Sequence, residues 1–169
     1  MMILHIRSRT ITVIDIAHSA FLVEWDKFYT LFDYVYEEEY TGELPELDPA
    51  KPLLVFASHR HEDHFSESIY DLCGETAVYI VGFDVPQPHR GVRMNPGETQ
   101  GFGPVTVKAF GSTDEGVSFL VTCAGVTIFH AGDLNLWHWR QESTLREIEA
   151  AETAFQDAMN QIRPEHIDV

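Results

Sequence analysis

Cysteines, basic residues and long apolar runs are all scarce in this chain of 169 residues. Its two cysteines, Cys73 and Cys123, are too few for a disulfide framework and are typical of a protein of the reducing cytoplasm. No segment reaches the roughly 18 uninterrupted apolar residues of a membrane-spanning helix. The N-terminal segment contains His5, Arg7 and Arg9, so it lacks the apolar core of a signal peptide. We therefore expect a soluble, unprocessed cytoplasmic protein with no membrane partner.

Basic residues are outnumbered by acidic ones. The chain has 11 Lys and Arg against 27 Asp and Glu, which gives a formal net charge of −16 with histidine neutral. The electrostatic field of a chain with this negative charge repels phosphate backbones. A nuclease or another nucleic-acid-binding protein is therefore disfavoured, and a small-molecule substrate is favoured. The hydrophobic fraction of 44% is sufficient for the core of one globular domain, which we expect to span residues 1–169.

Apolar patterning predicts many short strands and two helices. A short helix is expected over residues 66–73, because Ser66 can cap its N-terminus. A longer amphipathic helix is expected over residues 145–162, where Thr144 and Glu147 form a capping box. The expected strands are two within 11–25, then 28–35, 53–57, 76–81, a short one at 92–94 in a loop-rich stretch, a meander of 105–110, 117–123 and 126–130 with a tight turn at 124–125, and the start of a strand at 166–169.

A histidine-rich segment follows the apolar strand expected at 53–57. It reads Ser-His-Arg-His-Glu-Asp-His-Phe and contains His59, His61, Asp63 and His64. In an extended segment the first two histidines project to the same side, and a turn can bring the next two side chains to the same point. Three imidazoles and a carboxylate are a ligand set for a divalent metal, of which zinc is favoured and manganese or iron also fit.

Three stretches resemble a known family. The run His-Arg-His-Glu-Asp-His at 59–64 matches the His-x-His-x-Asp-His signature of the metallo-β-lactamase fold superfamily. Residues 17–24, Ala-His-Ser-Ala-Phe-Leu-Val-Glu, resemble the opening hairpin, which contains Gly-His-Ser, of a branch of small metal-dependent hydrolases that includes the ascorbate-lactone hydrolases. Residues 128–133, Ile-Phe-His-Ala-Gly-Asp, resemble the strand of that branch that ends in His-x-Gly-Asp.

The resemblance implies an α/β (α+β) fold, a four-layer αββα sandwich of two similar halves with a site for one or two metal ions. Carried over to this sequence, His59 and His61 would hold the first ion, Asp63 and His64 the second, and Asp133 would bridge them. The expected activity is hydrolysis of a small ester, lactone or phosphodiester by a metal-bound hydroxide. Asp63 is also the candidate catalytic residue, because it could orient that hydroxide by accepting its hydrogen bond.

The match leaves one ligand position open. The family carries a further histidine after the strand equivalent to 105–110, whereas this chain reads Gly-Ser-Thr-Asp-Glu-Gly at 111–116. Asp114 could replace that histidine or could be an ordinary turn residue. His130 could be a ligand, but a hydrogen bond that orients a ligand is favoured, and His18 is interpreted in the same way. The first metal site could also simply lack a ligand.

The family fold continues beyond the strand expected at 166–169, through a helix and a strand that precedes a final metal-binding histidine. This last strand–helix–strand portion is missing, so we expect a domain that is incomplete at its C-terminus and whose open sheet edge favours a homo-oligomer. Two functions remain open. The chain is either a metal-dependent hydrolase or a degenerate or truncated member that binds metal without catalytic turnover.

Overall fold

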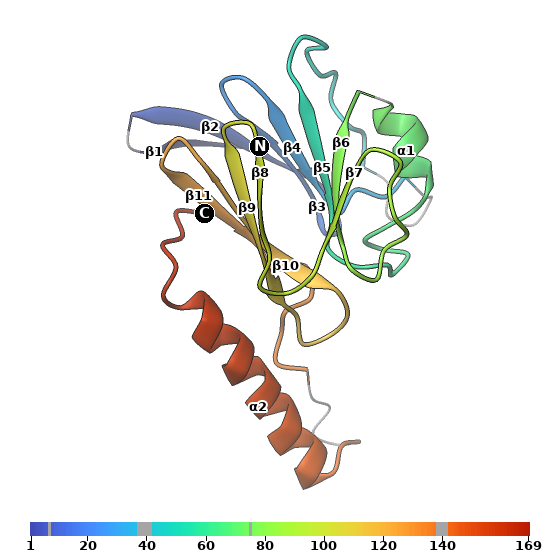
Figure 1. The fold of residues 1–169 in the computed structure, drawn as a ribbon, viewed down its shortest axis with the longest axis vertical. Helices are drawn as coiled ribbons and strands as arrows, with labels where there is room; N and C mark the ends of the chain where they lie inside the picture. Colours follow the sequence, from blue (N-terminus) through green and yellow to red (C-terminus); the bar gives the residue numbers. More distant parts are fainter. Residues whose placement is uncertain (7, 37–41, 75, 138–141) are drawn as a thin grey trace. The chain divides into compact units, whose positions relative to one another are not determined.

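The computed structural model describes residues 1–6, 8–36, 42–74, 76–137 and 142–169. They form two compact units, Met1–Met94 and Asn95–Val169, each of which is described by itself. Figure 1 shows the elements of both units with their labels. The expectation of one domain over residues 1–169 stays a prediction.

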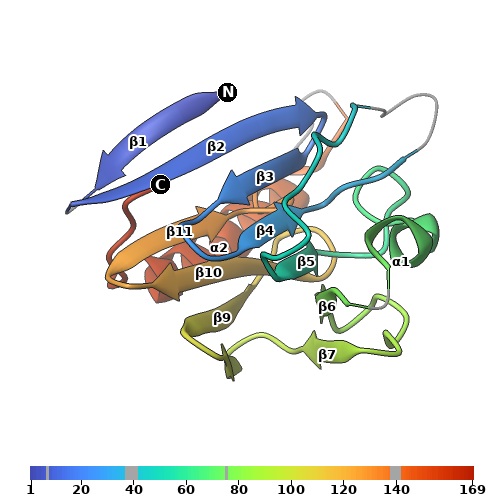
Figure 2. The ribbon, with the colours of Figure 1, turned by 90° about the horizontal axis from the view of Figure 1, so that it is seen from above.

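The first unit is built on a seven-stranded mixed sheet. Its strands are β1 (Met2–Ile6), β2 (Arg9–Ala17), β3 (Ala20–Glu24), β4 (Tyr29–Phe32), β5 (Leu53–Ala57), β6 (Val78–Gly82) and β7 (Gly91–Met94). They lie side by side in this order, as Figure 2 shows. The pairs from β1 to β4 are antiparallel, whereas those from β4 to β7 are parallel. Strand β1 was not predicted; within the described residues it is an edge strand of this sheet, where it pairs with β2.

The parallel part of this sheet positions the histidine-rich segment. All four residues of β4 are buried, and in β5 only Leu53 is partly exposed. The prediction that 53–57 is a strand covered on both faces is therefore confirmed. Because β4, β5 and β6 run in the same direction, the residues that follow them meet at one edge of the sheet.

Helix α1 (Ser68–Cys73) begins later than predicted. Glu67 occupies the N-cap position and makes no side-chain capping bond, so the prediction that Ser66 caps this helix is wrong. The Ser66 carbonyl accepts a hydrogen bond from the backbone N–H of Ile69 instead. Ile69 is buried in the core of the first unit and anchors the helix there.

The second unit contains a four-stranded antiparallel sheet in the order β11-β10-β9-β8. Its strands are β8 (Thr99–Phe102), β9 (Val105–Gly111), β10 (Val117–Cys123) and β11 (Val126–His130). The predicted meander is confirmed. Its tight turn has positive φ at both Ala124 (50°) and Gly125 (82°), as a two-residue hairpin of the primed type requires. Strand β8 was expected to be loop, and its pairing with β9 overrides its low strand propensity.

Helix α2 (Leu145–Ile162) has the predicted capping box between Thr144 and Glu147. Its C-terminal half packs against the sheet of the second unit, where Ile162 joins a buried cluster with Phe110 and Leu120. Leu145, at the other end, is 80% exposed. Among the described residues, no helix combines the length and the apolar character needed to cross a membrane.

The prediction of a strand at residues 166–169 is wrong, although the end of this segment makes hydrogen bonds to β11. Val169 pairs with β11 through two backbone hydrogen bonds, from its own N–H to the carbonyl of Thr127 and from the N–H of Phe129 to its carbonyl. The Asp168 carboxylate accepts a further bond from the Thr127 N–H at 2.9 Å. The preceding residues 166–167 are not part of a strand.

Candidate metal centre

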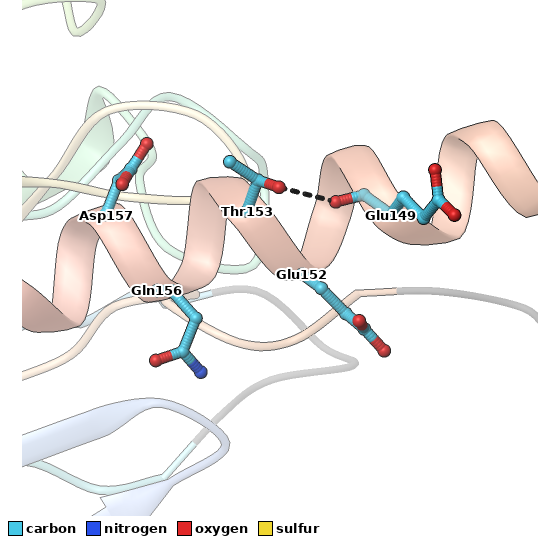
Figure 3. A pocket seen from close by; sticks show the side chains of 5 residues that line it. All are labelled: Glu149, Glu152, Thr153, Gln156 and Asp157. Atoms are coloured by element: carbon cyan, nitrogen blue, oxygen red, sulfur yellow. Dashed lines mark hydrogen bonds between the residues drawn. The ribbon is translucent and has the colours of Figure 1, made fainter.

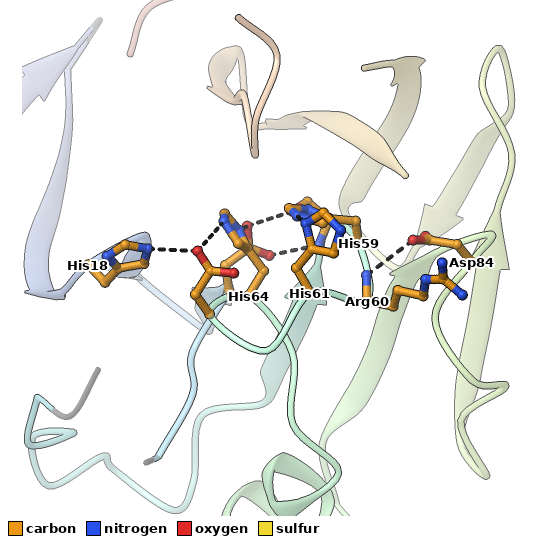
Figure 4. A network of polar contacts seen from close by, with 9 residues as sticks. His18, His59, Arg60, His61, His64 and Asp84 are labelled. Carbon is orange, nitrogen blue, oxygen red and sulfur yellow. Dashed lines mark hydrogen bonds and ion pairs between the residues drawn. The ribbon is translucent and has the colours of Figure 1, made fainter. Parts of the chain in front are cut away.

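The histidine-rich segment turns back on itself directly after β5. The backbone N–H groups of His64 and Phe65 both donate to the carbonyl of His61, at 3.0 and 2.8 Å, and close one tight turn. The structure thereby brings together the four side chains predicted as ligands within the first unit, as Figure 4 shows in part. Their roles as metal ligands stay predictions.

Two of the imidazoles are in direct contact. The Nε2 atom of His59 lies 3.0 Å from Nδ1 of His61. The ring of His59 also lies 4.1 Å, centroid to centroid, from the ring of His64. His59 is fully buried and His64 is 2% exposed, so neither ring is an ordinary surface histidine.

Asp33 was not predicted as a site residue, but it is hydrogen-bonded to His64 in the candidate site. It follows β4 directly, is 1% exposed and adopts a positive φ of 43°. Its carboxylate accepts three hydrogen bonds, from the Ser58 N–H (2.7 Å), the Ser58 hydroxyl (2.7 Å) and Nδ1 of His64 (2.8 Å). The available signal was an Asp placed immediately after an apolar strand, in the run Tyr-Thr-Leu-Phe-Asp.

These bonds determine which histidine nitrogens carry protons. The Ser58 hydroxyl donates to Asp33 and therefore accepts from Nδ1 of His59, which lies 2.9 Å away. Likewise, Nδ1 of His64 donates to the carboxylate of Asp33. In neutral imidazoles this leaves Nε2 deprotonated in both His59 and His64, which is the state that a metal ligand requires.

Asp63 lies at the more exposed end of the cluster. Its Oδ2 atom is 3.0 Å from Nε2 of His18 and 3.6 Å from Nε2 of His64. Partial burial of Asp63 raises the pKa of its carboxyl, but the lowering effects, of which the His18 hydrogen bond is the largest, outweigh burial and hold that pKa below its ordinary value. His18 itself sits in the hairpin between β2 and β3, with a φ of 49°.

Asp84 is a second residue that the sequence analysis missed. It lies just after β6, and its Oδ2 atom accepts the backbone N–H of Arg60 at 3.1 Å, between two candidate ligands (Figure 4). The end of β6 is packed tightly against the start of the histidine-rich segment, because a Cβ atom on Gly82 would lie 2.2 Å from the Ser58 carbonyl oxygen. Asp84 therefore fixes the backbone of this segment from the neighbouring strand.

The other predicted site residues belong to the second unit. His130 ends β11, and Asp133 lies in the turn that follows, where its carbonyl accepts the indole N–H of Trp137 at 2.9 Å. Asp114 lies in the loop between β9 and β10 and is exposed. The two loops are joined by hydrogen bonds between Thr113 and Asn135, one of which is 3.0 Å long. The part of these residues in metal binding stays a prediction.

A separate hollow lies on helix α2 (Figure 3). Its lining comes from one helix only, and the hydroxyl of Thr153 is committed to the carbonyl of Glu149 at 2.8 Å. Exposed carboxylates on a helix face are typical of a solvated surface. The side chains concerned are those of Glu149, Glu152, Thr153, Gln156 and Asp157. We therefore place the candidate site at the histidine cluster.

The donor set fits a divalent transition metal. His18, Asp63 and His64 offer three ligand atoms that all lie within 4.8 Å of one another. Imidazole nitrogens and a carboxylate oxygen suit zinc, manganese and iron. The hydrogen bonds from Nδ1 of His64 and of His59 supply the orientation that metal-binding histidines usually have.

Comparison with known proteins finds relatives that are described as metal-dependent hydrolases. The UPF0173 metal-dependent hydrolase of Desulforamulus reducens is 31% identical, over a match that covers 72% of this chain and 61% of that protein. The crystal structure of a candidate metal-dependent hydrolase from Parabacteroides distasonis superposes with a TM-score of 0.62 at 16% identity. This match covers 80% of this chain and 66% of that protein's chain. The crystal structure of a metallo-beta-lactamase from Staphylococcus aureus superposes with a TM-score of 0.51 at 12% identity. That match covers 90% of this chain and 53% of the other.

The chain spans less than two thirds of the length of each of these relatives. At such identities the two solved structures show the fold alone, and they confirm the predicted metallo-β-lactamase-like α+β class. Residues 12–155 match the family described as Beta-lactamase superfamily domain. Since that match covers most of the sequence, the chain belongs to the beta-lactamase superfamily.

Proposed function

We propose that this chain provides the metal centre of a metal-dependent hydrolase. The observation that carries the proposal is the buried chain of hydrogen bonds from Asp33, which holds His59 and His64 with Nε2 deprotonated. A structural histidine needs no such control of its tautomer, whereas a metal ligand does. Zinc is the metal we propose, and manganese and iron suit the same donors.

The predicted ligands divide into two groups. His59 and His61 would hold one ion, and Asp63 and His64 would hold a second, with Asp133 proposed as the bridging ligand. When bound, such ions supply Lewis acidity and lower the pKa of water towards about 7.

Asp63 is the residue we propose to act on the attacking water. An aspartate carboxylate is ionised at neutral pH, so Asp63 can accept a hydrogen bond from water and orient it. The Nε2 atom of His18 lies 3.0 Å from Oδ2 of Asp63. The substrate is proposed to be a small ester, lactone or phosphodiester, since a net charge of −16 disfavours polyanionic nucleic acids.

The test combines metal analysis with hydrolysis assays. The purified protein, with and without added zinc or manganese, is analysed by mass spectrometry for bound metal. It is then assayed with p-nitrophenyl acetate, a simple γ-lactone and bis(p-nitrophenyl) phosphate. We expect one or two bound ions per chain and metal-dependent turnover of at least one of these compounds.

His61→Ala is the matched variant and His89→Ala the control, because His89 is an exposed histidine of the same unit outside the cluster. We expect the first to lose metal and turnover and the second to keep both. Absence of bound metal in the unmodified protein, even after supplementation, contradicts the proposal. Bound metal without turnover of any of the three compounds favours the alternative, a family member that binds metal without catalysis.

A further inference from the structure

The hairpin between β2 and β3 delivers a histidine to the candidate metal centre. His18 and Ser19 form its two-residue turn, since Ala17 and Ala20 are the last paired residues. The positive φ of His18 (49°) is a backbone conformation that few side chains adopt, and histidine is among the more tolerant types. The turn thus places an imidazole beside a segment 45 residues away in the sequence.

Three ligand atoms converge at this point from two segments of the first unit. The Nε2 atom of His18 is 3.0 Å from Oδ2 of Asp63, which is itself 3.6 Å from Nε2 of His64. The centroids of the two histidine rings are 6.1 Å apart, and the ring planes are nearly perpendicular, at 75°. This is a geometry in which one cation can contact all three atoms after small side-chain shifts.

Burial changes steadily across the three residues. The His64 side chain is 1% exposed and is fixed by Asp33, the Asp63 side chain is 30% exposed, and the His18 side chain is 45% exposed. A rigid ligand on the inner side and more accessible ligands on the outer side leave an approach for water and substrate. Three protein ligands with open positions are typical of catalytic rather than structural metal sites.

We propose that His18 is a metal ligand, which forms with Asp63 and His64 a cation site of two imidazoles and one carboxylate. This inference rests on the proposed function, because it assigns a further ligand to the same metal centre. It changes the interpretation from the sequence, which favoured a supporting role for His18. His59 and His61, whose Nε2 and Nδ1 atoms are 3.0 Å apart, keep the role proposed above as ligands of the other ion.

The experiment measures metal affinity in three variants and does not depend on catalytic activity. His18→Ala removes the ligand. His18→Gln removes the imidazole but keeps an amide N–H that can donate to Asp63. His89→Ala is the control. Zinc affinity is measured by competition with a chromophoric chelator, and cobalt binding by its visible absorption, with thermal unfolding of the metal-free proteins to verify that each is folded.

We expect both His18 variants to weaken zinc binding at one site by at least about tenfold and to change the cobalt spectrum, with His89→Ala like the unmodified protein. An affinity that falls in His18→Ala but is retained in His18→Gln shows that His18 only positions Asp63, and overturns the ligand role. Unchanged affinity and spectra in both variants overturn it as well. These two results leave the proposed function standing, whereas an unmodified protein that binds no metal contradicts both proposals.

Discussion

The Nδ1 atom of His64 and the Oδ2 atom of Asp33 lie 2.8 Å apart, and the two side chains are 1% and 0% exposed. This contact links the end of β4 to a segment that follows β5. Through Ser58, the same carboxylate also reaches His59. One buried carboxylate thus orients two imidazoles of the candidate metal centre. Replacing Asp33 should therefore change the hydrogen bonds that set the protonation of these two rings.

Asp33→Asn should weaken metal binding although it preserves the shape of the side chain. The amide group of asparagine donates hydrogen bonds, so it would face either a Ser58 donor or Nδ1 of His64. If His64 responds by accepting at Nδ1, its proton moves to Nε2, where a metal ligand needs a lone pair. We expect zinc affinity to fall by about 10- to 100-fold in chelator competition. Asp26→Asn, at an exposed position of the same unit, should bind zinc like the unmodified protein.

Ser58→Ala tests the second branch of the same network. Ser58 is fully buried, and its hydroxyl connects Asp33 to Nδ1 of His59. Without it, the N–H of His59 has lost this acceptor, so the free energy of unfolding should fall by about 1–3 kcal/mol. Urea unfolding of the metal-free protein measures this loss. A stability equal to that of the unmodified protein would show that the hydroxyl is not needed to hold His59.

The sequence indicated the histidine-rich segment as the candidate site because its candidate ligands are close together in the chain and follow a recognisable strand. Asp33 and Asp84 were not predicted, although both contact this segment. Asp33 is 31 residues from His64, and Asp84 is 24 residues from Arg60. Both become neighbours only because the parallel strands β4, β5 and β6 end at the same edge of the sheet.

Sequence signals that depend on a few neighbouring residues predicted the local structure correctly. The capping box at Thr144 and Glu147 and the hairpin turn at Ala124 and Gly125 depend on a few consecutive residues, and both form as predicted. Strand β8 depends on its pairing with the next strand, β9, and the start of helix α1 depends on packing in the core of the first unit. For this reason propensity alone gave the wrong state for β8 and the wrong cap for α1.

Cys73 provides a prediction of pH dependence away from the metal centre. Burial raises the pKa of its thiol from 9.0 to about 12. The folded protein therefore keeps a proton that the unfolded chain releases above pH 9, so stability is fully present below that pH and falls as the pH rises towards 12. Burial raises the pKa of Tyr79 to about 12 as well, in the same direction. Urea unfolding at pH 8 and at pH 10.5 should show a lower midpoint at the higher pH.

Cys73→Ala separates the thiol from the tyrosine. This variant should show a smaller loss of stability between the two pH values than the unmodified protein. Burial raises the pKa of the native thiol well above that of the unfolded chain, so at pH 8 iodoacetamide should modify it much more slowly than in the urea-unfolded chain. Rapid modification of Cys73 in the native protein, detected by peptide mass spectrometry, is incompatible with its burial.

Asp84 offers a test of how the backbone of the histidine-rich segment is positioned. Its Oδ2 atom accepts the Arg60 N–H at 3.1 Å, and within the described part of the chain Oδ1 is buried with no hydrogen-bond partner. Asp84→Asn keeps a carbonyl that can accept the same N–H and removes the negative charge from a partly buried position. Asp84→Ala removes the acceptor, so it should loosen the backbone between His59 and His61.

We therefore expect Asp84→Ala to raise the zinc dissociation constant by about tenfold and to speed hydrogen–deuterium exchange at the Arg60 amide, while Asp84→Asn changes both much less. The comparison matters because the two variants remove the same charge. Equal losses in both would assign the effect to the field of the carboxylate on the bound cation. A loss seen only in Asp84→Ala assigns the effect to the hydrogen bond between Asp84 and the Arg60 N–H. The end of β6 would then position the backbone that carries the candidate ligands.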